Sequence, residues 1–143
     1  MSKERNQAAI DNCNQVIRNC TSQIAENQTQ IDDLNGKITR LETAVSTLSS
    51  QKESLDSQSV QVRTAQSDFT DWKGVNRIQY AEQVNSLDSV SFNAYKMQTN
   101  HAHTGIKDEL SRLKQQKTSL ENQITCLQNK IWDWSNYLTV LMS

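Results

Sequence analysis

The chain has 143 residues, of which 35% are hydrophobic and 6% aromatic, with three glycines, no proline and a formal net charge of −1. An ordinary globular domain is about half apolar, so this composition argues against a multilayer enzyme with a thick core. Disorder is also disfavoured, because the net charge is low and the apolar residues are strongly periodic, which leaves an elongated all-α protein with a thin core.

Several classes of partner and location are disfavoured by the same data. Lysine and arginine are spread evenly, so no basic stripe favours nucleic acid, and no apolar run approaches the roughly 18 residues needed for membrane insertion. Residues 1–7 contain no hydrophobic segment of the kind found in a Sec signal peptide. We therefore expect a cytoplasmic protein. Cys13 and Cys20 lie too far apart along a helix for a disulfide, and we expect them in the core.

Residues from about 3 to about 67 are predicted to form one long helix with a heptad repeat. β-Branched residues recur at every seventh position, and mostly cysteine or leucine occupies the core positions between them. A period of 3.5 residues predicts helices that wrap around one another as a coiled coil. The expected seam of this helix includes Ile10, Ile17, Ile24, Ile31, Leu34, Ile38, Leu41 and Leu48.

A bend is predicted over residues from about 68 to about 76. The segment Asp71-Trp72-Lys73-Gly74 lies there, between two helical halves of nearly equal length. Gly74 permits a turn because it has no Cβ, and the Trp72 indole is large enough to fill the open end where two helices diverge. Asn76 followed by Gln79 has the spacing of a capping box and indicates the start of a second helix.

The second helix is expected from about residue 77 to about residue 140. The apolar residues of its second half form a regular heptad stripe. A different phase is followed in its first half by Tyr80, Val84, Leu87, Ala94 and His101. We therefore expect a kink or a change of face near residues 101–105, beside Gly105. The seam residues predicted for this helix include Leu113, Leu120, Ile124, Leu127, Ile131 and Trp134.

Two long helices joined by a short turn fold back as an antiparallel hairpin. A turn centred near Lys73 and Gly74 places residue i opposite roughly residue 147 minus i, so that Cys20 would face Leu127 and Cys13 would face Trp134. A hairpin of two helices leaves much of each helix surface uncovered. We therefore expect a partner that completes a bundle.

Four aromatic residues are candidates for the partner-binding surface. Phe92, Tyr95, Trp132 and Tyr137 lie off or beside the expected seam, and exposed aromatic side chains on a thin protein favour an association surface. The alternative is that they belong to a wider core stripe.

Nothing in the sequence indicates catalysis, a metal site or a cofactor. His101 and His103 are two residues apart and point about 200° apart on a helix, so they cannot chelate one ion together. The common phosphate-binding, zinc-protease and hydrolase motifs are missing, and no serine has an evident histidine partner to activate it. We expect that the protein is not an enzyme.

A long helical hairpin with Trp-x-Gly at its bend resembles the WXG-type proteins of the bacterial type VII (ESX) secretion system. More narrowly, it resembles the longer coiled-coil relatives encoded beside LXG-domain toxins. Residues Asp71-Trp72-Lys73-Gly74 and the stretch 106–124 carry this resemblance. It implies a small helical protein that pairs with a helical toxin domain and marks it for export. The family's Tyr-x-x-x-Asp/Glu signal is missing, because Leu141 follows Tyr137 at that spacing. The chain would then depend on a partner for the signal, or would stay behind as a cytoplasmic adaptor.

The function expected from these features is that of an accessory targeting chaperone. It would bind the helical N-terminal domain of an LXG toxin, or another small helical protein of the same system, and promote export from the cytoplasm. One alternative is a self-associating coiled-coil scaffold, such as a homodimer of continuous rods, with no secretion role. A third possibility is that the protein is itself secreted, either as an effector or together with its partner.

Overall fold

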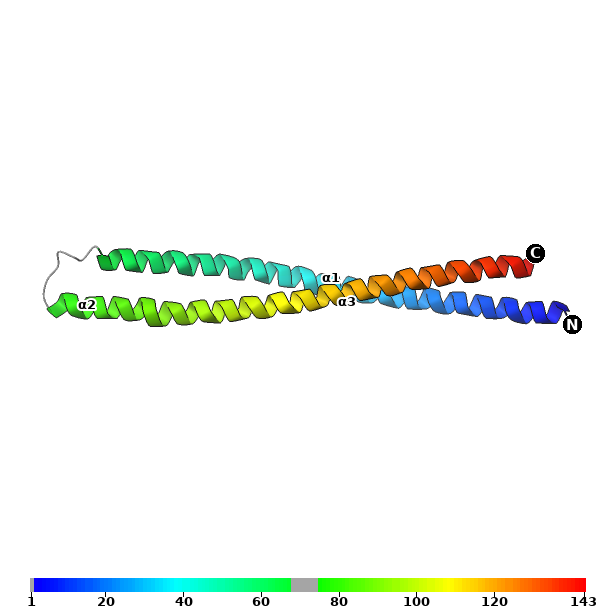
Figure 1. Ribbon diagram of the computed structural model, residues 1–143, viewed down its shortest axis with the longest axis horizontal. Helices are drawn as coiled ribbons and strands as arrows, with labels where there is room; N and C mark the ends of the chain where they lie inside the picture. The colour runs from blue at the N-terminus through cyan, green and yellow to red at the C-terminus, as the bar shows by residue number, and fades with distance from the viewer. Residues whose placement is uncertain (1, 68–74) are drawn as a thin grey trace. The chain divides into compact units, whose positions relative to one another are not determined.

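The computed structural model describes residues 2–67 and 75–143. Helix α1 spans Ser2–Ser67, α2 spans Val75–Ser86, the π-helical segment η1 spans Leu87–Phe92, and α3 spans Asn93–Met142 (Figure 1). Within these two ranges there is no strand and almost every residue is helical. The prediction of an all-α helical hairpin is therefore confirmed. The bend residues Trp72 and Gly74 lie outside the described residues.

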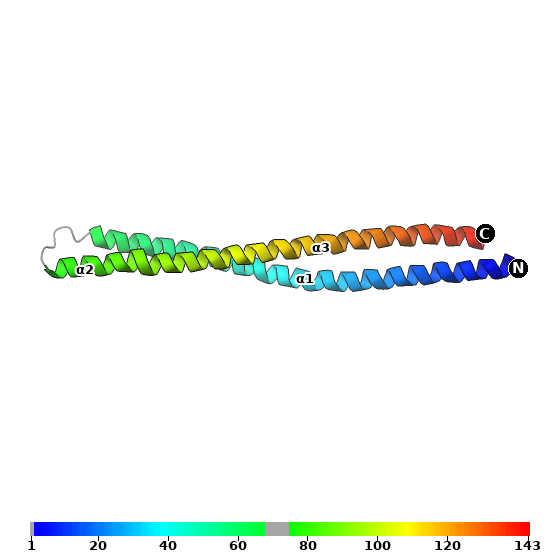
Figure 2. The same ribbon diagram turned by 60° about the horizontal axis from the view of Figure 1, so that its bottom comes forward.

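The chain divides into two compact units, and each contains a part of both halves of the hairpin. We call Met1–Thr39 together with Ser111–Ser143 the terminal unit, and Arg40–Leu110 the central unit. In both views, α1 runs alongside the second half of the chain within each unit (Figures 1 and 2). The expected range of the first helix was about 3 to 67, and that of the second about 77 to 140.

The terminal unit has a narrow hydrophobic seam. Its buried side chains come from the predicted heptad positions of both helices, and Cys13 has no exposed surface. Cysteine is small and apolar enough to pack where two helices approach closely. The buried residues of this unit are Cys13, Cys20, Ile31, Leu34, Ile38, Leu113 and Leu120.

Polar contacts across the hairpin define its register. In the terminal unit, Asn27 Nδ2 donates to Gln123 Oε1 at 3.3 Å. In the central unit, Ser49 Oγ lies 3.3 Å from His103 Nε2, and Lys96 Nζ lies 3.2 Å from Asp56 Oδ1. Residue i is thus paired with roughly residue 150 to 152 minus i, beyond the value of 147 expected from a turn centred at Gly74. The long, uniform stripe of isoleucine and leucine permits several registers, and the polar pairs distinguish between them.

These contacts also bear on the rod alternative. Residues 27 and 123 could not form a hydrogen bond within one chain if the helices continued as a single rod. The same holds for the pairs Ser49–His103 and Asp56–Lys96 in the central unit. The contacts inside each unit therefore support the folded-back chain.

The central unit has a more polar seam than the terminal unit. Only Val84 and Ser59 are buried among its described side chains. On the second half of the hairpin, the half-buried side chains are spaced alternately four and three residues apart from Phe92 onward. They are Phe92, Lys96, Thr99, His103, Ile106 and Leu110, and Glu109, beside Leu110, is half-buried as well. Of the residues that we expected on one face, Val84 is buried, whereas the other four are exposed: Tyr80, Leu87, Ala94 and His101.

The irregularity of the second half lies at η1 rather than near Gly105. α3 is α-helical without interruption through residues 101–105. Val84 lies eight residues before Phe92, whereas an unbroken heptad places the same seam position seven residues earlier. A π-helical turn holds one more residue than an α-helical turn. η1 therefore absorbs a one-residue insertion and keeps Val84 and Phe92 on the same seam.

No described helix is long and apolar enough to cross a membrane.

Candidate functional site

An exposed aromatic face lies near the end of α3 in the terminal unit. Trp132 is 67% exposed, Tyr137 50% and Val140 68%. The seam there uses Ile131, Trp134, Leu138 and Leu141, which are all half-buried. A helix that turns this seam inward must present its other positions to solvent. Asp133, Tyr137 and Val140 are neighbours on it, because they are spaced four and three residues apart, and Trp132 lies at the edge of this group. We call Trp132, Asp133, Tyr137 and Val140 the C-terminal face.

Trp134 connects this face to the seam. Its ring packs edge-to-face against the ring of Tyr137, with centroids 6.0 Å apart and an interplanar angle of 79°. This geometry is favoured for aromatic pairs and restrains the Tyr137 ring. Asp133, Trp134 and Tyr137 line a small open pocket of about 280 Å³. The face thus combines large apolar surfaces, one restrained ring and one carboxylate.

The four aromatic residues predicted as a partner surface do not form one cluster. Trp132 and Tyr137 belong to the terminal unit, whereas Phe92 and Tyr95 belong to the central unit. Tyr95 is 61% exposed, but Phe92 is half-buried on the seam side at the end of η1. Asp133 was not among the residues predicted for the partner-binding surface. Its position four residues before Tyr137, as the only acidic residue of the last 22, was the available signal.

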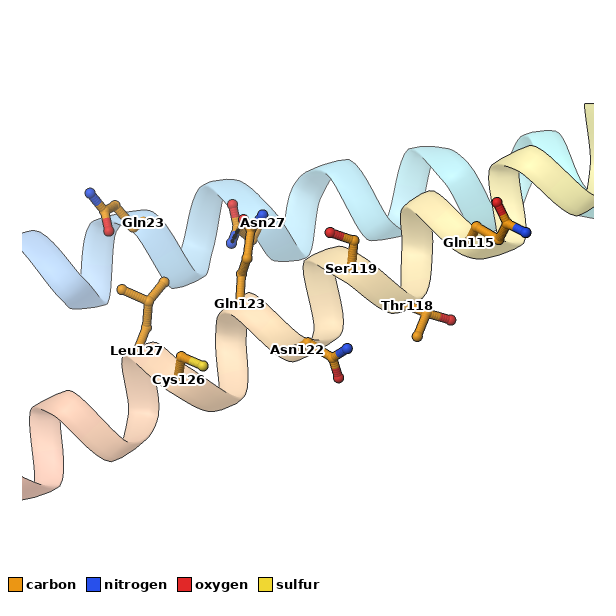
Figure 3. Close-up of a pocket in the computed structure, with 9 residues that line it drawn as sticks. All are labelled: Gln23, Asn27, Gln115, Thr118, Ser119, Asn122, Gln123, Cys126 and Leu127. Atoms are coloured by element: carbon orange, nitrogen blue, oxygen red, sulfur yellow. Dashed lines mark hydrogen bonds between the residues drawn. The ribbon is translucent and has the colours of Figure 1, made fainter.

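A second hollow in the terminal unit is lined mostly by residues with uncharged polar side chains. Gln23 and Asn27 of α1 line it together with residues of α3, and its volume is about 780 Å³ (Figure 3). The Asn27–Gln123 hydrogen bond joins its two walls. Amides donate and accept hydrogen bonds but supply neither a nucleophile nor a base. The residues contributed by α3 are Gln115, Thr118, Ser119, Asn122, Gln123, Cys126 and Leu127.

One serine–histidine pair corrects the sequence analysis, which found no histidine partner for any serine. Ser49 and His103 are within hydrogen-bond distance in the central unit, and both side chains are half-buried. A nucleophilic serine needs a base that is itself oriented by a third group. Among residues 2–67 and 75–143, no carboxylate contacts His103. The pair is a polar contact of the seam, equivalent to Asn27–Gln123.

Within residues 2–67 and 75–143, no three histidine, cysteine, aspartate or glutamate side chains are grouped so that they could hold a metal ion. Cys13 and Cys20 are free thiols in the seam, and Cys126 is a free, exposed thiol.

Together, the fold and the exposed face define a helical-hairpin protein in which residues 2–67 and 75–143 leave one surface of α3 uncovered. The chain belongs to the YwqH-like family, which matches residues 15–136, and this family is associated with LXG toxin systems. The match includes Trp132 and Asp133 and ends just before Tyr137. A comparison with curated proteins gave no significant match.

Proposed function

We propose that this protein is an accessory targeting chaperone for a type VII secretion substrate. It binds the helical N-terminal domain of an LXG toxin, or another small helical protein of that system, and promotes export of the toxin. Membership of the YwqH-like family supports the link to LXG toxins. The observation that carries the proposal is the exposed aromatic face of α3, with Trp132 67% exposed.

The physical basis is the limited burial that two helices achieve. Each helix of a hairpin covers only one stripe of the other, so Trp132, Tyr137 and Val140 remain in contact with water. Covering a large apolar side chain contributes roughly 1.5–3 kcal/mol. A helical toxin domain whose own apolar stripe is uncovered would gain a similar free energy when that stripe is buried. The complex thus buries surfaces that neither protein covers alone and keeps the toxin domain from aggregating.

Export of the toxin depends on formation of the complex and not on a reaction at this chain. In this proposal the protein performs no catalysis and needs no cofactor. The complex forms in the cytoplasm and presents a signal made by both partners, since Leu141 occupies the position of the acidic residue after Tyr137. Whether the chaperone leaves the cell with the toxin is an outcome that the export assay reports.

Binding and export test this proposal together. The protein is titrated into the purified N-terminal domain of the neighbouring LXG toxin by calorimetry, and secreted toxin is compared in strains with and without the protein. We expect a defined complex and a loss of secreted toxin without it. Trp132→Ala and Tyr137→Ala should each weaken binding about thirtyfold or more, as for aromatic anchors of about 2 kcal/mol. Gln116→Ala, an exposed polar change on α3, is the control.

Three results would contradict the proposal. The wild-type protein fails to bind the toxin domain, or toxin export is unchanged without it, or the exposed face proves to mediate a stable homodimer that excludes the toxin. The last result would support the scaffold alternative. Light scattering on the protein alone and in the mixture separates it from the other two.

A further inference from the structure

The pocket on the C-terminal face combines two kinds of group that recognise a cation. Asp133, Trp134 and Tyr137 line its volume of about 280 Å³. The two rings are held edge-to-face with centroids 6.0 Å apart, and the carboxylate of Asp133 lies one helical turn before Tyr137. Aromatic faces attract cations through their quadrupole, and a carboxylate attracts them by charge.

The carboxylate of Asp133 has no partner within residues 2–67 and 75–143. No hydrogen bond or ion pair to it is found there, although Lys130 lies three residues earlier on the same helix. These two residues are the only charged ones between Asn122 and Ser143. Of the two, Asp133 is the one that lines the pocket, and its negative charge is unpaired within the described residues.

A partner that covers the C-terminal face changes the surroundings of the Asp133 carboxylate. A helix laid over Trp132 and Tyr137 would remove water from the neighbouring carboxylate. An ionised carboxylate that loses its water is destabilising unless a cation or several donors replace that water. A fitting partner must therefore bring a positive charge to this position.

We propose that the pocket receives an arginine side chain from the partner helix. The guanidinium group stacks against Tyr137 and Trp134 and pairs with the Asp133 carboxylate. Arginine fits better than lysine, because its planar group stacks on rings and binds a carboxylate through two parallel hydrogen bonds. The partner is then an amphipathic helix with an arginine beside its apolar stripe. This inference rests on the proposed function and adds the chemistry that selects the partner.

The test compares variants of Asp133 in binding to the toxin N-terminal domain by calorimetry. Asp133→Asn should weaken binding at least about fivefold, because it removes the charge and keeps the shape. Asp133→Arg should weaken it at least about thirtyfold by placing like charges together. Asp108→Asn is the matched control, since Asp108 is also an exposed aspartate of α3 without an ion pair. Circular dichroism checks that each variant stays helical.

A charge reversal identifies the arginine itself. Each arginine of the toxin domain is changed to glutamate, and one such change should restore binding to the Asp133→Arg protein while weakening binding to the wild type. If both Asp133 variants bind like the wild type while Trp132→Ala binds weakly, the proposed function stands and the arginine pocket is overturned. If the wild type does not bind the toxin domain, both proposals fail together.

Discussion

Single polar side chains give this hairpin its alignment. Asn27 occupies a heptad position between Ile24 and Ile31, and its amide pairs with that of Gln123 at 3.3 Å. A polar residue in a coiled-coil core lowers stability compared with leucine but disfavours registers that leave it unpaired. Ser49, which follows the seam residue Leu48, forms a similar polar contact across the central unit with His103.

Gly105 lies in the uninterrupted part of α3 and offers a direct test of that continuity. An ideal Cβ added there meets nothing within 4 Å, and the residue is exposed. Because glycine in a helix interior is about 0.5–1 kcal/mol less favourable than alanine, Gly105→Ala should raise the midpoint of thermal unfolding by roughly 2–4 °C. Ala102→Gly, an exposed site on the same helix, should lower it similarly. A destabilising Gly105→Ala would mean that the helix is broken there.

The exposure of individual aromatic residues could be predicted only where the seam phase was evident. Trp132 and Tyr137 flank the regular stripe through Ile131 and Trp134, and both are exposed. Phe92 is half-buried because the seam shifts by one residue at η1. No periodicity of apolar residues marks that shift, since polar Lys96, Thr99 and His103 occupy the following seam positions. Partner binding by these residues stays a prediction.

At the scale of elements, the first helix was the most predictable and the second half the least. The expected range was about 3 to 67, and α1 spans Ser2–Ser67. The regular heptad repeat of mostly isoleucine and leucine indicates both the period of this helix and the face that it buries. From Lys96 to His103 the seam itself is polar. The apolar residues of this region therefore did not reveal it, and the predicted stripe followed Tyr80, Ala94 and His101 instead. The bend motif Trp72 and Gly74 lies outside the described residues and stays an expectation.

η1 should be removable without loss of the fold. Deleting Ser91, which is exposed, would place Val84 seven residues before Phe92 and restore an unbroken heptad. We expect this segment to become α-helical, because the extra residue that a π turn accommodates is then gone. The midpoint of thermal unfolding, followed by circular dichroism, should stay equal or increase.

Deletion of Gln98 is the matched control for the deletion of Ser91. Gln98 is also exposed, but it lies within the regular part of α3. Its loss would rotate the preceding seam residues by about 100° relative to those that follow, so the unfolding midpoint should fall by several degrees. Equal destabilisation by both deletions would show that η1 does not correct the heptad phase.

At the scale of the whole molecule, the two units differ in what holds each of them together. The terminal unit buries isoleucine, leucine and cysteine side chains along its seam, whereas Val84 and Ser59 are the only buried side chains described in the central unit. The central unit relies more on polar contacts, such as the pair of Asp56 and Lys96, which is partly exposed to solvent. Exposed ion pairs contribute only about 0–1 kcal/mol, so the central unit should open more readily than the terminal unit.

Hydrogen exchange followed by mass spectrometry measures this difference segment by segment. Backbone amides are released by local opening, whose free energy depends on the apolar contacts that must be broken. We expect peptides covering residues 13–38 and 113–134 to exchange more slowly than those covering 45–62 and 84–106. If the toxin domain binds the C-terminal face, its addition should slow exchange further around Trp132. Uniform exchange along both helices would mean that the polar seam of the central unit is as stable as the hydrophobic seam of the terminal unit.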